Sequence, residues 1–480
     1  MDDVHNAIPP SAAHHTRRWC EAAVIAAAAM IAIVSARDYA GGWNDGSRLA
    51  TVEALVDHRT LAIDQSIFVR SPAHADAPNP YTPGDESLRL QGTQDKLLID
   101  GHYYSDKSPL PAFWLAACYE LLQRVTGLTA QEHPRWFCYL MTVLSAGIAY
   151  VISVWSVWRL ALRHDLPLAA CAVLAASLGL ATVAPVYARQ VNNHILLLAV
   201  VSLIMLAIDR RRALYPAATG TLAGIGYTLD LGVGPVLVLC TAALVAYRSR
   251  RLMAIACFCL FAAPWLAAHH AVNYHLGGTF GPANSVAAYL AWPGSPFSVR
   301  NMTGGWAHHN LGHFSLYAAA LLFGKHGFLN YNLPFFLALP SAAFLSRRRL
   351  VELPELSFAV AFSGGAWLLY AALSNNYSGP CCSIRWFVPF LAPGYFVLVL
   401  AVRERRQPFF DLRRLTCLGA CLACLLWWRG PWEGAVPYLL WPLNVMALLL
   451  LVLQRRPPGE EVGYKLARNV GSLAPCASHD

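Results

Sequence analysis

Charged residues are scarce in this chain. Only 13% of its 480 residues are Asp, Glu, Lys or Arg, and no more than 27 are acidic. A soluble globular protein carries about a quarter of its residues charged, so this composition excludes an ordinary soluble enzyme. Hydrophobic residues make up 56% of the chain and the mean hydropathy is +0.42. These values indicate an integral membrane protein.

Several motifs are also missing. The sequence has neither a P-loop nor the glycine-rich dinucleotide fingerprint, which argues against a nucleotide-sugar donor. It has no tight acidic cluster of the DxD type, so we expect no required cofactor, although Asp45, Asp95 and Asp106 offer oxygen ligands to a divalent cation. Most of the 13 Cys residues stand singly in apolar runs, where Cys behaves as a small apolar side chain, and no disulfide framework is indicated.

Apolar runs recur along nearly the whole chain. Most are roughly 17 to 22 residues long, the length with which an α-helix crosses a bilayer. We therefore predict an all-α polytopic membrane protein with about 12 transmembrane helices. The predicted spans are 22–36, 136–155, 167–186, 192–208, 213–229, 231–247, 252–270, 327–345, 356–374, 386–402, 415–428 and 436–454.

Basic residues report the topology. The net charge of +9 comes mainly from Lys and Arg in short loops between spans, so it does not indicate nucleic-acid binding. Clusters such as Arg17-Arg18, Arg210-Arg211-Arg212, Arg347-Arg348-Arg349 and Arg455-Arg456 are expected on the cytoplasmic side. Residues 1–18 and 455–480 then form cytoplasmic termini around a single transmembrane domain, 19–454, in the cytoplasmic membrane.

The long segment 38–135 holds 13 of the 27 acidic residues and is expected outside the membrane. Its apolar stretch 110–122 is short, begins at Pro109-Leu110-Pro111 and carries Glu120. A third crossing there would place Arg159 outside, so we predict a helix lying in the outer membrane surface. Segments 271–313 and 375–385 are predicted as further outer loops.

The two ends of segment 38–135 carry the polar motifs Trp43-Asn44-Asp45-Gly46-Ser47-Arg48 and Tyr104-Ser105-Asp106-Lys107-Ser108-Pro109. This layout resembles that of the GT-C superfamily of glycosyltransferases. Those enzymes have an acidic residue just beyond the first span, a later Tyr-x-x-Lys-Pro-Pro-like segment, a surface helix, and an Arg at the head of the second span. The resemblance is to protein O-mannosyltransferases and lipid A aminoarabinose transferases in particular, and covers the first ~160 residues. Arg135 matches the Arg of that pattern, whereas Asn44-Asp45 replaces the usual Asp-Glu pair and Ser108 replaces one proline.

The resemblance implies a polyprenyl-phosphate-linked sugar as donor, and the residue types suit that chemistry. Removing a proton from the acceptor hydroxyl needs a general base, for which Asp45 is the candidate. The departing phosphate needs cations, and the candidates are Lys107, Arg48, Arg135 and Arg385. Further candidate site residues are Asp95, Asp106, Tyr104 and Asp230.

Structural interpretations remain open for several of these residues. Asp45 suits a helix N-cap, Lys107 an interfacial lysine and Asp230 a turn beside Gly232 and Pro235. The histidines His308, His309 and His313 have a spacing that would suit zinc, but no Cys or carboxylate lies near them in sequence.

We therefore predict a membrane glycosyltransferase that moves a sugar to an acceptor glycan, lipid or protein at the outer face of the cytoplasmic membrane. The alternatives are a transporter or lipid flippase without transferase activity, and a polysaccharide ligase. Apart from Asp230, the acids lie in loops rather than at mid-bilayer depth, which favours a surface site over a translocation pathway.

Overall fold

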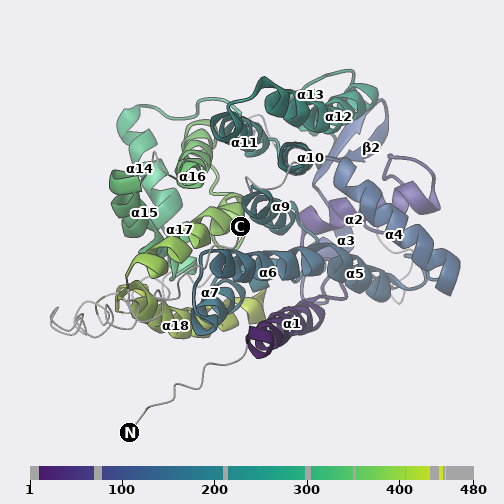
Figure 1. Cartoon of the computed structure of the whole chain (residues 1–480). Coiled ribbons are helices and arrows are strands. Elements are labelled where there is room, and N and C mark those ends of the chain that lie inside the picture. The colour runs from purple at the N-terminus through teal and green to yellow at the C-terminus, as the bar shows by residue number, and fades with distance from the viewer. Residues whose placement is uncertain are drawn as a thin grey trace, which may run out of the picture.

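The computed structural model describes residues 10–69, 78–208, 214–297, 304–349, 353–405, 407–432, 443–446 and 449. Helices dominate it (Figure 1). The α-helices are α1 (Pro10–Ser35), α2 (Trp43–Asp57), α3 (Glu86–Gln91), α4 (Leu110–Thr126), α5 (Pro134–Thr142), α6 (Ile148–Arg163), α7 (Leu168–Leu180), α8 (Ala184–Tyr187), α9 (Asn193–Ala207), α10 (Tyr215–Leu229), α11 (Gly234–Ser249), α12 (Leu252–Gly277), α13 (Ala287–Leu290), α14 (Leu311–Phe323), α15 (Phe335–Arg349), α16 (Pro354–Leu373), α17 (Leu391–Glu404) and α18 (Gln407–Arg429).

Among the described residues, five helical segments are long and apolar enough to cross a bilayer. They are His15–Ser35, Pro134–Arg163, Leu252–Gly277, Pro354–Leu373 and Arg385–Glu404. Each overlaps a span predicted from the sequence. The second is one continuous rod, because the π-helical turn η1 (Val143–Gly147) joins α5 to α6.

Several other predicted spans are shorter or broken. Helices α7, α9 and α11 are apolar but have only 13, 15 and 16 residues, fewer than the ~20 that a perpendicular span needs. The predicted span 327–345 bends: the segments Leu311–Tyr331 and Phe335–Arg347 meet at 113°. Most of the predicted span 436–454 lies outside the described residues, so the count of about 12 spans stays a prediction.

Helices α9 and α17 form the centre of the molecule (Figure 1). Helix α9 packs against α6, α10, α17 and the 3₁₀ turn η5 (Arg385–Phe390), and nearly all its side chains are buried. It starts at Asn192, whose side chain accepts a hydrogen bond from the Ile195 N–H at 3.1 Å and so satisfies a free backbone donor of the first turn. The N-terminus of α9 is thereby fixed close to the polar site described below.

The described parts of segment 38–135 contribute to an apolar core separate from the main one. Helices α2 and α4 pack together there, around side chains that include Leu49, Val52, Leu115 and Phe137. The outward face of α4 carries the exposed apolar side chains Phe113, Trp114, Leu121 and Val125. This pattern suits the surface helix predicted at 110–122.

The prediction of an all-α protein is wrong in one detail that matters for the site. Strands β1 (Lys96–Ile99) and β2 (His102–Ser105) form an antiparallel hairpin. Asp100 and Gly101 make its turn with φ angles of +50° and +84°. An Asp-Gly pair between β-favouring residues is a strong hairpin signal, because both central residues of the favoured turn need positive φ. That local signal was outweighed by the helical character of the rest of the chain.

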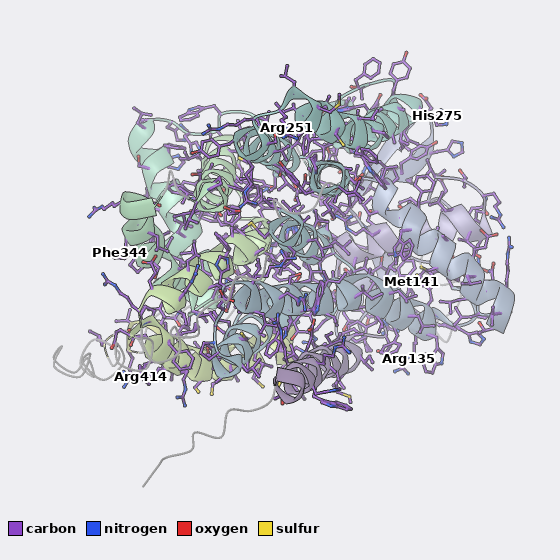
Figure 2. The ribbon with its side chains drawn as sticks, in the orientation of Figure 1. Arg135, Met141, Arg251, His275, Phe344 and Arg414 are labelled. Carbon is purple, nitrogen blue, oxygen red and sulfur yellow. The ribbon has the colours of Figure 1, made fainter. Side chains whose placement is uncertain are left out.

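Labelled residues from predicted outer and cytoplasmic segments lie at different ends of the molecule. Figure 2 shows Arg135 and His275 toward the end where β2 and α4 lie, and Arg414 at the opposite end. The sequence places Arg135 and His275 in outer loops and Arg414 on the cytoplasmic side. The arrangement therefore agrees with one polar outer end, while the sidedness itself stays a prediction.

The surface position of α4 is testable by labelling. We expect Gln131→Cys, an exposed position after α4, to react with a membrane-impermeant thiol reagent added to intact cells, in a background without the exposed cysteines Cys259, Cys417, Cys421 and Cys424. Arg347→Cys at the predicted cytoplasmic end of α15 is the matched control and should react only after permeabilisation. Protection of Gln131→Cys in intact cells would show that α4 crosses the membrane.

Candidate active site

Helix α2 carries the first polar motif, and 12 of its 15 residues are buried. Its apolar side chains pack against α4. Its polar side chains Asn44, Asp45, Ser47 and Arg48 are buried as well. Asp45 and Arg48 are three residues apart and therefore lie on the same side of the helix. The helix starts after Gly42, and a Cβ at the preceding Gly41 would lie only 1.7 Å from Nε2 of Gln190. Only glycine at position 41 allows the chain to pass Gln190 this closely.

Asp45 is fully buried and only half satisfied. Its Oδ2 accepts a hydrogen bond from the Gly41 N–H at 2.7 Å, whereas its Oδ1 is buried without a partner. Burial raises the pKa of Asp45 to about 7, against the opposing effect of the backbone N–H groups at the start of α2. The carboxyl therefore both supports the helix start and offers one free oxygen. A base poised near neutral pH is what proton abstraction from a hydroxyl requires.

Lys107 lies between two carboxylates. Its Nζ is 2.8 Å from Oδ2 of Asp95 and 2.7 Å from Oδ2 of Asp106, and all three side chains are largely buried. Burial raises the pKa of Asp106, and the charge of Lys107 opposes that shift. Oδ1 of Asp106 is buried without a partner. Lys107, a predicted phosphate-binding cation, therefore forms ion pairs with two carboxylates.

The hairpin brings this triad to α2. Ser47 Oγ donates to the backbone carbonyl of Asp95 at 2.5 Å and lies 2.6 Å from Oγ of Ser105. Thr93 Oγ1 donates to the carbonyl of Trp43 at 2.7 Å. These short contacts join residues about fifty positions apart in sequence, and they place Lys107 beside the first turns of α2.

Arg48 connects the triad to the centre of the molecule. Burial lowers the pKa of Arg48 to about 10, opposed chiefly by the charges of Asp106 and Asp230 and reinforced by that of Arg385. The charges of Arg385, Arg48 and Lys107 also act together on His194 at the start of α9. Six residues singled out from the sequence thus share one electrostatic environment: Arg48, Asp95, Asp106, Lys107, Asp230 and Arg385.

Asp230 is firmly held in the turn between α10 and α11. Its Oδ1 accepts hydrogen bonds from Tyr370 Oη at 2.9 Å and from the Gly232 N–H at 2.9 Å. Its Oδ2 accepts one from Asn193 Nδ2 at 3.2 Å. With these donors the carboxylate is satisfied, so it serves as a fixed negative charge facing Arg48.

Two predicted residues are not brought to this cluster. Arg135 has a 79% exposed side chain and its Nε donates to Asp38 at 2.6 Å. Tyr104 packs with Leu97, Ile99 and Ala283 in a small separate cluster under the hairpin. Arg135 and Tyr104 thus lie among residues outside the polar cluster around Lys107 and Arg48.

A cavity of 420 Å³ opens beside Arg48 and Lys107. This volume is typical of ligand-binding cavities. Its polar side is formed by Arg48, Lys107, Ser105 and Ser108, and the remaining wall is mostly apolar. The apolar lining comes from α2, α4, α6, α9, α10 and α12, and includes Val52, Pro111, Trp114, Leu144, Ile148, Ile152, Leu196, Val200, Leu203, Leu222, Ile225, Leu229 and Trp265.

A polar run that was not among the predicted site residues lies near Asp45 in the structure. Arg189 and Gln190 stand between the apolar runs 167–186 and 192–208, and both are buried. On the predicted topology this short loop faces outward, where a basic residue goes against the positive-inside rule. That violation was a readable signal of function. Trp432, from the far end of the chain, lies in the same region. No sequence motif around Trp432 indicates a site residue.

No metal cluster accompanies these residues. In the part of the chain that the structure describes, no three His, Cys, Asp or Glu side chains are gathered in a way that would hold a metal ion. Nδ1 of His308 lies 3.2 Å from Nδ1 of His313, and Nε2 of His308 lies 2.6 Å from the carbonyl of Ala371. These histidines form a packed cluster with Trp306 and Tyr317.

Comparisons with known proteins give a likeness in fold. No protein-family model matches the chain, and no curated protein matches it. Its structure is similar to that of ArnT from Cupriavidus metallidurans bound to undecaprenyl phosphate, with a TM-score of 0.48 and 12% identity over 90% of this chain and 75% of that one. It is also similar to the Archaeoglobus fulgidus oligosaccharyltransferase in the apo form, with a TM-score of 0.43 and 12% identity over 95% of this chain and 60% of that one. At these values the likeness concerns the arrangement of helices and not the chemistry of the site.

The protonation of Asp45 can be observed directly. We expect infrared difference spectra to show carboxyl groups that are protonated below pH 7 and ionise as the pH rises through about 7, because burial raises the pKa of both Asp45 and Glu53 to about 7. The folded protein holds these protons more tightly than the unfolded chain, so their contribution to stability is present at acidic pH and is lost as the pH rises toward 7.

Single variants assign the two signals. Asp45→Asn should remove one component and Glu53→Gln the other, since Glu53 lies on the same helix with its own partner, Ser66 Oγ at 2.6 Å. A spectrum in which Asp45→Asn removes nothing between pH 5 and 8 would mean that Asp45 is already ionised throughout that range.

The Lys107 triad should dominate the stability of this region. Lys107→Met leaves two buried carboxylates without their cation, and breaking a buried ion pair costs about 3–5 kcal/mol of unfolding free energy. Combining Lys107→Met with Asp106→Asn should recover part of that loss, because one of the two uncompensated charges is gone. Arg124→Met is the control: it removes a surface ion pair with Glu120 and should cost less than about 1 kcal/mol. Equal effects of Lys107→Met and Arg124→Met in denaturant unfolding would contradict a structural role for the triad.

Proposed function

We propose that this protein is a membrane glycosyltransferase that transfers a sugar from a polyprenyl-phosphate donor to a hydroxyl of an acceptor. The observation that carries the proposal is the 420 Å³ cavity, which has the cations Arg48 and Lys107 on its polar side and a mostly apolar interior. Arg48 lies three residues from the buried carboxyl of Asp45 on α2. A phosphate joined to a long hydrocarbon chain matches this cavity, with a charged group for the cations and an apolar chain for the apolar interior.

The donor fits this cavity in one orientation. Its phosphate lies against Arg48 and Lys107, with Arg385 within electrostatic range. Its first isoprene units follow the apolar wall past Trp114 and Trp265. Electrostatic stabilisation of the charge that develops on a leaving group is commonly the largest single contribution to catalysis. Lys107 contributes despite its two acidic neighbours, because its ammonium group has a third donor position available.

Asp45 acts as the general base. The acceptor oxygen forms a bond to the anomeric carbon of the sugar, and the bond from that carbon to the phosphate oxygen breaks. The electron pair of the broken bond stays on the phosphate, and the hydroxyl proton passes to the carboxylate of Asp45. The unpartnered Oδ1 is the oxygen free to take the proton.

The reaction belongs on the outer side of the cytoplasmic membrane in this proposal. Arg414, which the sequence predicts on the cytoplasmic side, lies at the opposite end of the molecule (Figure 2) and supports that orientation through the positive-inside rule. Protein cations supply the charge that the mechanism needs, so no cofactor is required by it.

The decisive experiment uses Asp45→Asn. An amide cannot accept the proton, so we expect transfer to fall roughly 10²–10⁴-fold, while the protein remains folded and still binds undecaprenyl phosphate. The donor sugar is identified first, as the polyprenyl-phosphate sugar that accumulates in a deletion strain. Transfer and lipid binding are then measured on the same preparation, with thermal unfolding as the fold control.

Glu53→Gln is the matched control. Glu53 is a second buried carboxyl on α2 whose pKa burial raises to about 7, but both its oxygens already accept hydrogen bonds, from Ser66 Oγ and the Ile67 N–H. This variant should keep transfer and the rise of the rate with pH through about 7 that ionisation of Asp45 produces. Lipid binding with no sugar transfer by the wild-type protein would favour a lipid flippase, and full activity of Asp45→Asn would remove Asp45 as the base.

A further inference from the structure

A second set of buried polar groups surrounds Asp45 and takes no part in the proposed donor site. It consists of Arg189, Gln190 and Trp432, here called the Arg189 cluster. None of the three lines the 420 Å³ cavity. Each has at least one buried side-chain nitrogen or oxygen without a hydrogen-bond partner.

Distances place this cluster next to the candidate base. A Cβ at Gly42 would lie 3.1 Å from Cγ of Trp432 and 3.5 Å from Oδ1 of Asp45, and a Cβ at Gly41 would overlap Nε2 of Gln190. A Cβ at Gly430, two residues before Trp432, would lie 3.7 Å from Nη1 of Arg189. The free oxygen of Asp45 and the free donors of the cluster therefore share one region.

Arg189 is the most unusual member. Its side chain is only 2% exposed, and both Nε and Nη1 lack a hydrogen-bond partner. The guanidinium lies 5.0 Å from the centroid of the Trp427 ring. Among the residues that the structure describes, no carboxylate forms an ion pair with it. A buried charge without a counter-ion is strongly unfavourable, so a site that keeps one is built for an anion that arrives with a ligand.

The donor pattern defines the ligand chemistry. A guanidinium presents paired N–H groups that match the two oxygens of a carboxylate or a phosphate. Trp432 adds an indole N–H whose nitrogen is buried and unpartnered, and Gln190 adds an unpartnered carbonyl oxygen that suits a hydroxyl. The combination fits an anionic group next to a hydroxyl.

We propose that the Arg189 cluster binds a carboxylate or phosphate group of the acceptor and holds the neighbouring hydroxyl toward Asp45. The acceptor is then an acidic glycan or a phosphate-bearing lipid. The identification of this ligand as the acceptor rests on the proposed transfer reaction. The anion site itself stands on the buried, unpaired Arg189.

The test separates this site from the donor site. Full-length protein in lipid nanodiscs is saturated with undecaprenyl phosphate and then titrated with glycerol 1-phosphate or glucuronate, with glycerol and glucose as neutral controls. We expect the wild-type protein to bind at least one of the two anions without displacing the lipid. Arg189→Gln should weaken anion binding roughly ten- to a hundredfold, the effect of losing hydrogen bonds from a charged group, and should leave lipid affinity within about twofold.

Two further variants keep the result interpretable. Lys107→Met combined with Asp106→Asn should show the opposite pattern, with weakened lipid binding and intact anion binding. Arg189→Met replaces the unpaired charge by an apolar side chain that still covers Trp427, and should raise the unfolding temperature of the ligand-free protein. A purely structural arginine would instead lower it.

The remaining outcomes each decide the matter. Failure of the wild-type protein to bind either anion, or unchanged anion binding in Arg189→Gln, overturns the proposal. Displacement of undecaprenyl phosphate by the anion, with both lost in Arg189→Gln, assigns Arg189 to the donor phosphate and also overturns it. Arg189-dependent anion binding without any lipid binding would sustain the anion site and contradict the proposed transferase.

Discussion

The contact of Lys107 with Asp95 and Asp106 holds the polar site together. The buried apolar side chains of the hairpin, Leu97 and Ile99, pack with Ala283. The ion triad joins the two ends of the hairpin, and the hydrogen bonds of Ser47 and Thr93 join it to α2. Buried charges stabilise only when their geometry and partners are complete. The same arrangement that fixes the hairpin therefore fixes a cation at the edge of the apolar cavity.

Burial then sets the chemistry of α2. The apolar residues of α2 pack against α4, and that packing also removes Asp45 and Arg48 from water. Loss of hydration shifts the two groups in the directions that favour their neutral forms, which raises the pKa of Asp45 and lowers that of Arg48. A carboxyl that would be an ordinary ionised acid on a surface becomes a base that is poised near neutral pH.

The surroundings of α2 divide the site into two regions. Toward Lys107, the cations are matched by acids and border an apolar cavity that comes from six helices. Around Gly41 and Gly42, Arg189 and Trp432 present donors that no group of the described chain uses. Asp45 lies beside the second region and three residues from Arg48 of the first. An enzyme that joins a lipid-linked donor to a polar acceptor needs such a base where its two substrates meet.

The sequence by itself determined the membrane class, the main apolar helices and the polar motifs around Asp45 and Lys107. It could do so because hydropathy, charge content and local motifs are properties of short segments. It also contained two local signals outside the helical pattern. The Asp100-Gly101 pair indicates a hairpin turn, and Arg189 is a basic residue in a predicted outer loop.

Only the tertiary structure decided which residues meet. Arg135 and Lys107 are both candidate cations in the sequence, with Lys107 the better placed. In the structure Arg135 pairs with Asp38 at the surface, whereas Lys107 is enclosed beside α2. Asp230, Arg385 and Trp432 reach the site from turns and loops hundreds of residues away, and no local pattern encodes such a contact. Burial, pairing and the resulting pKa of Asp45 depend on long-range packing, and for that reason they appear only once the chain is folded.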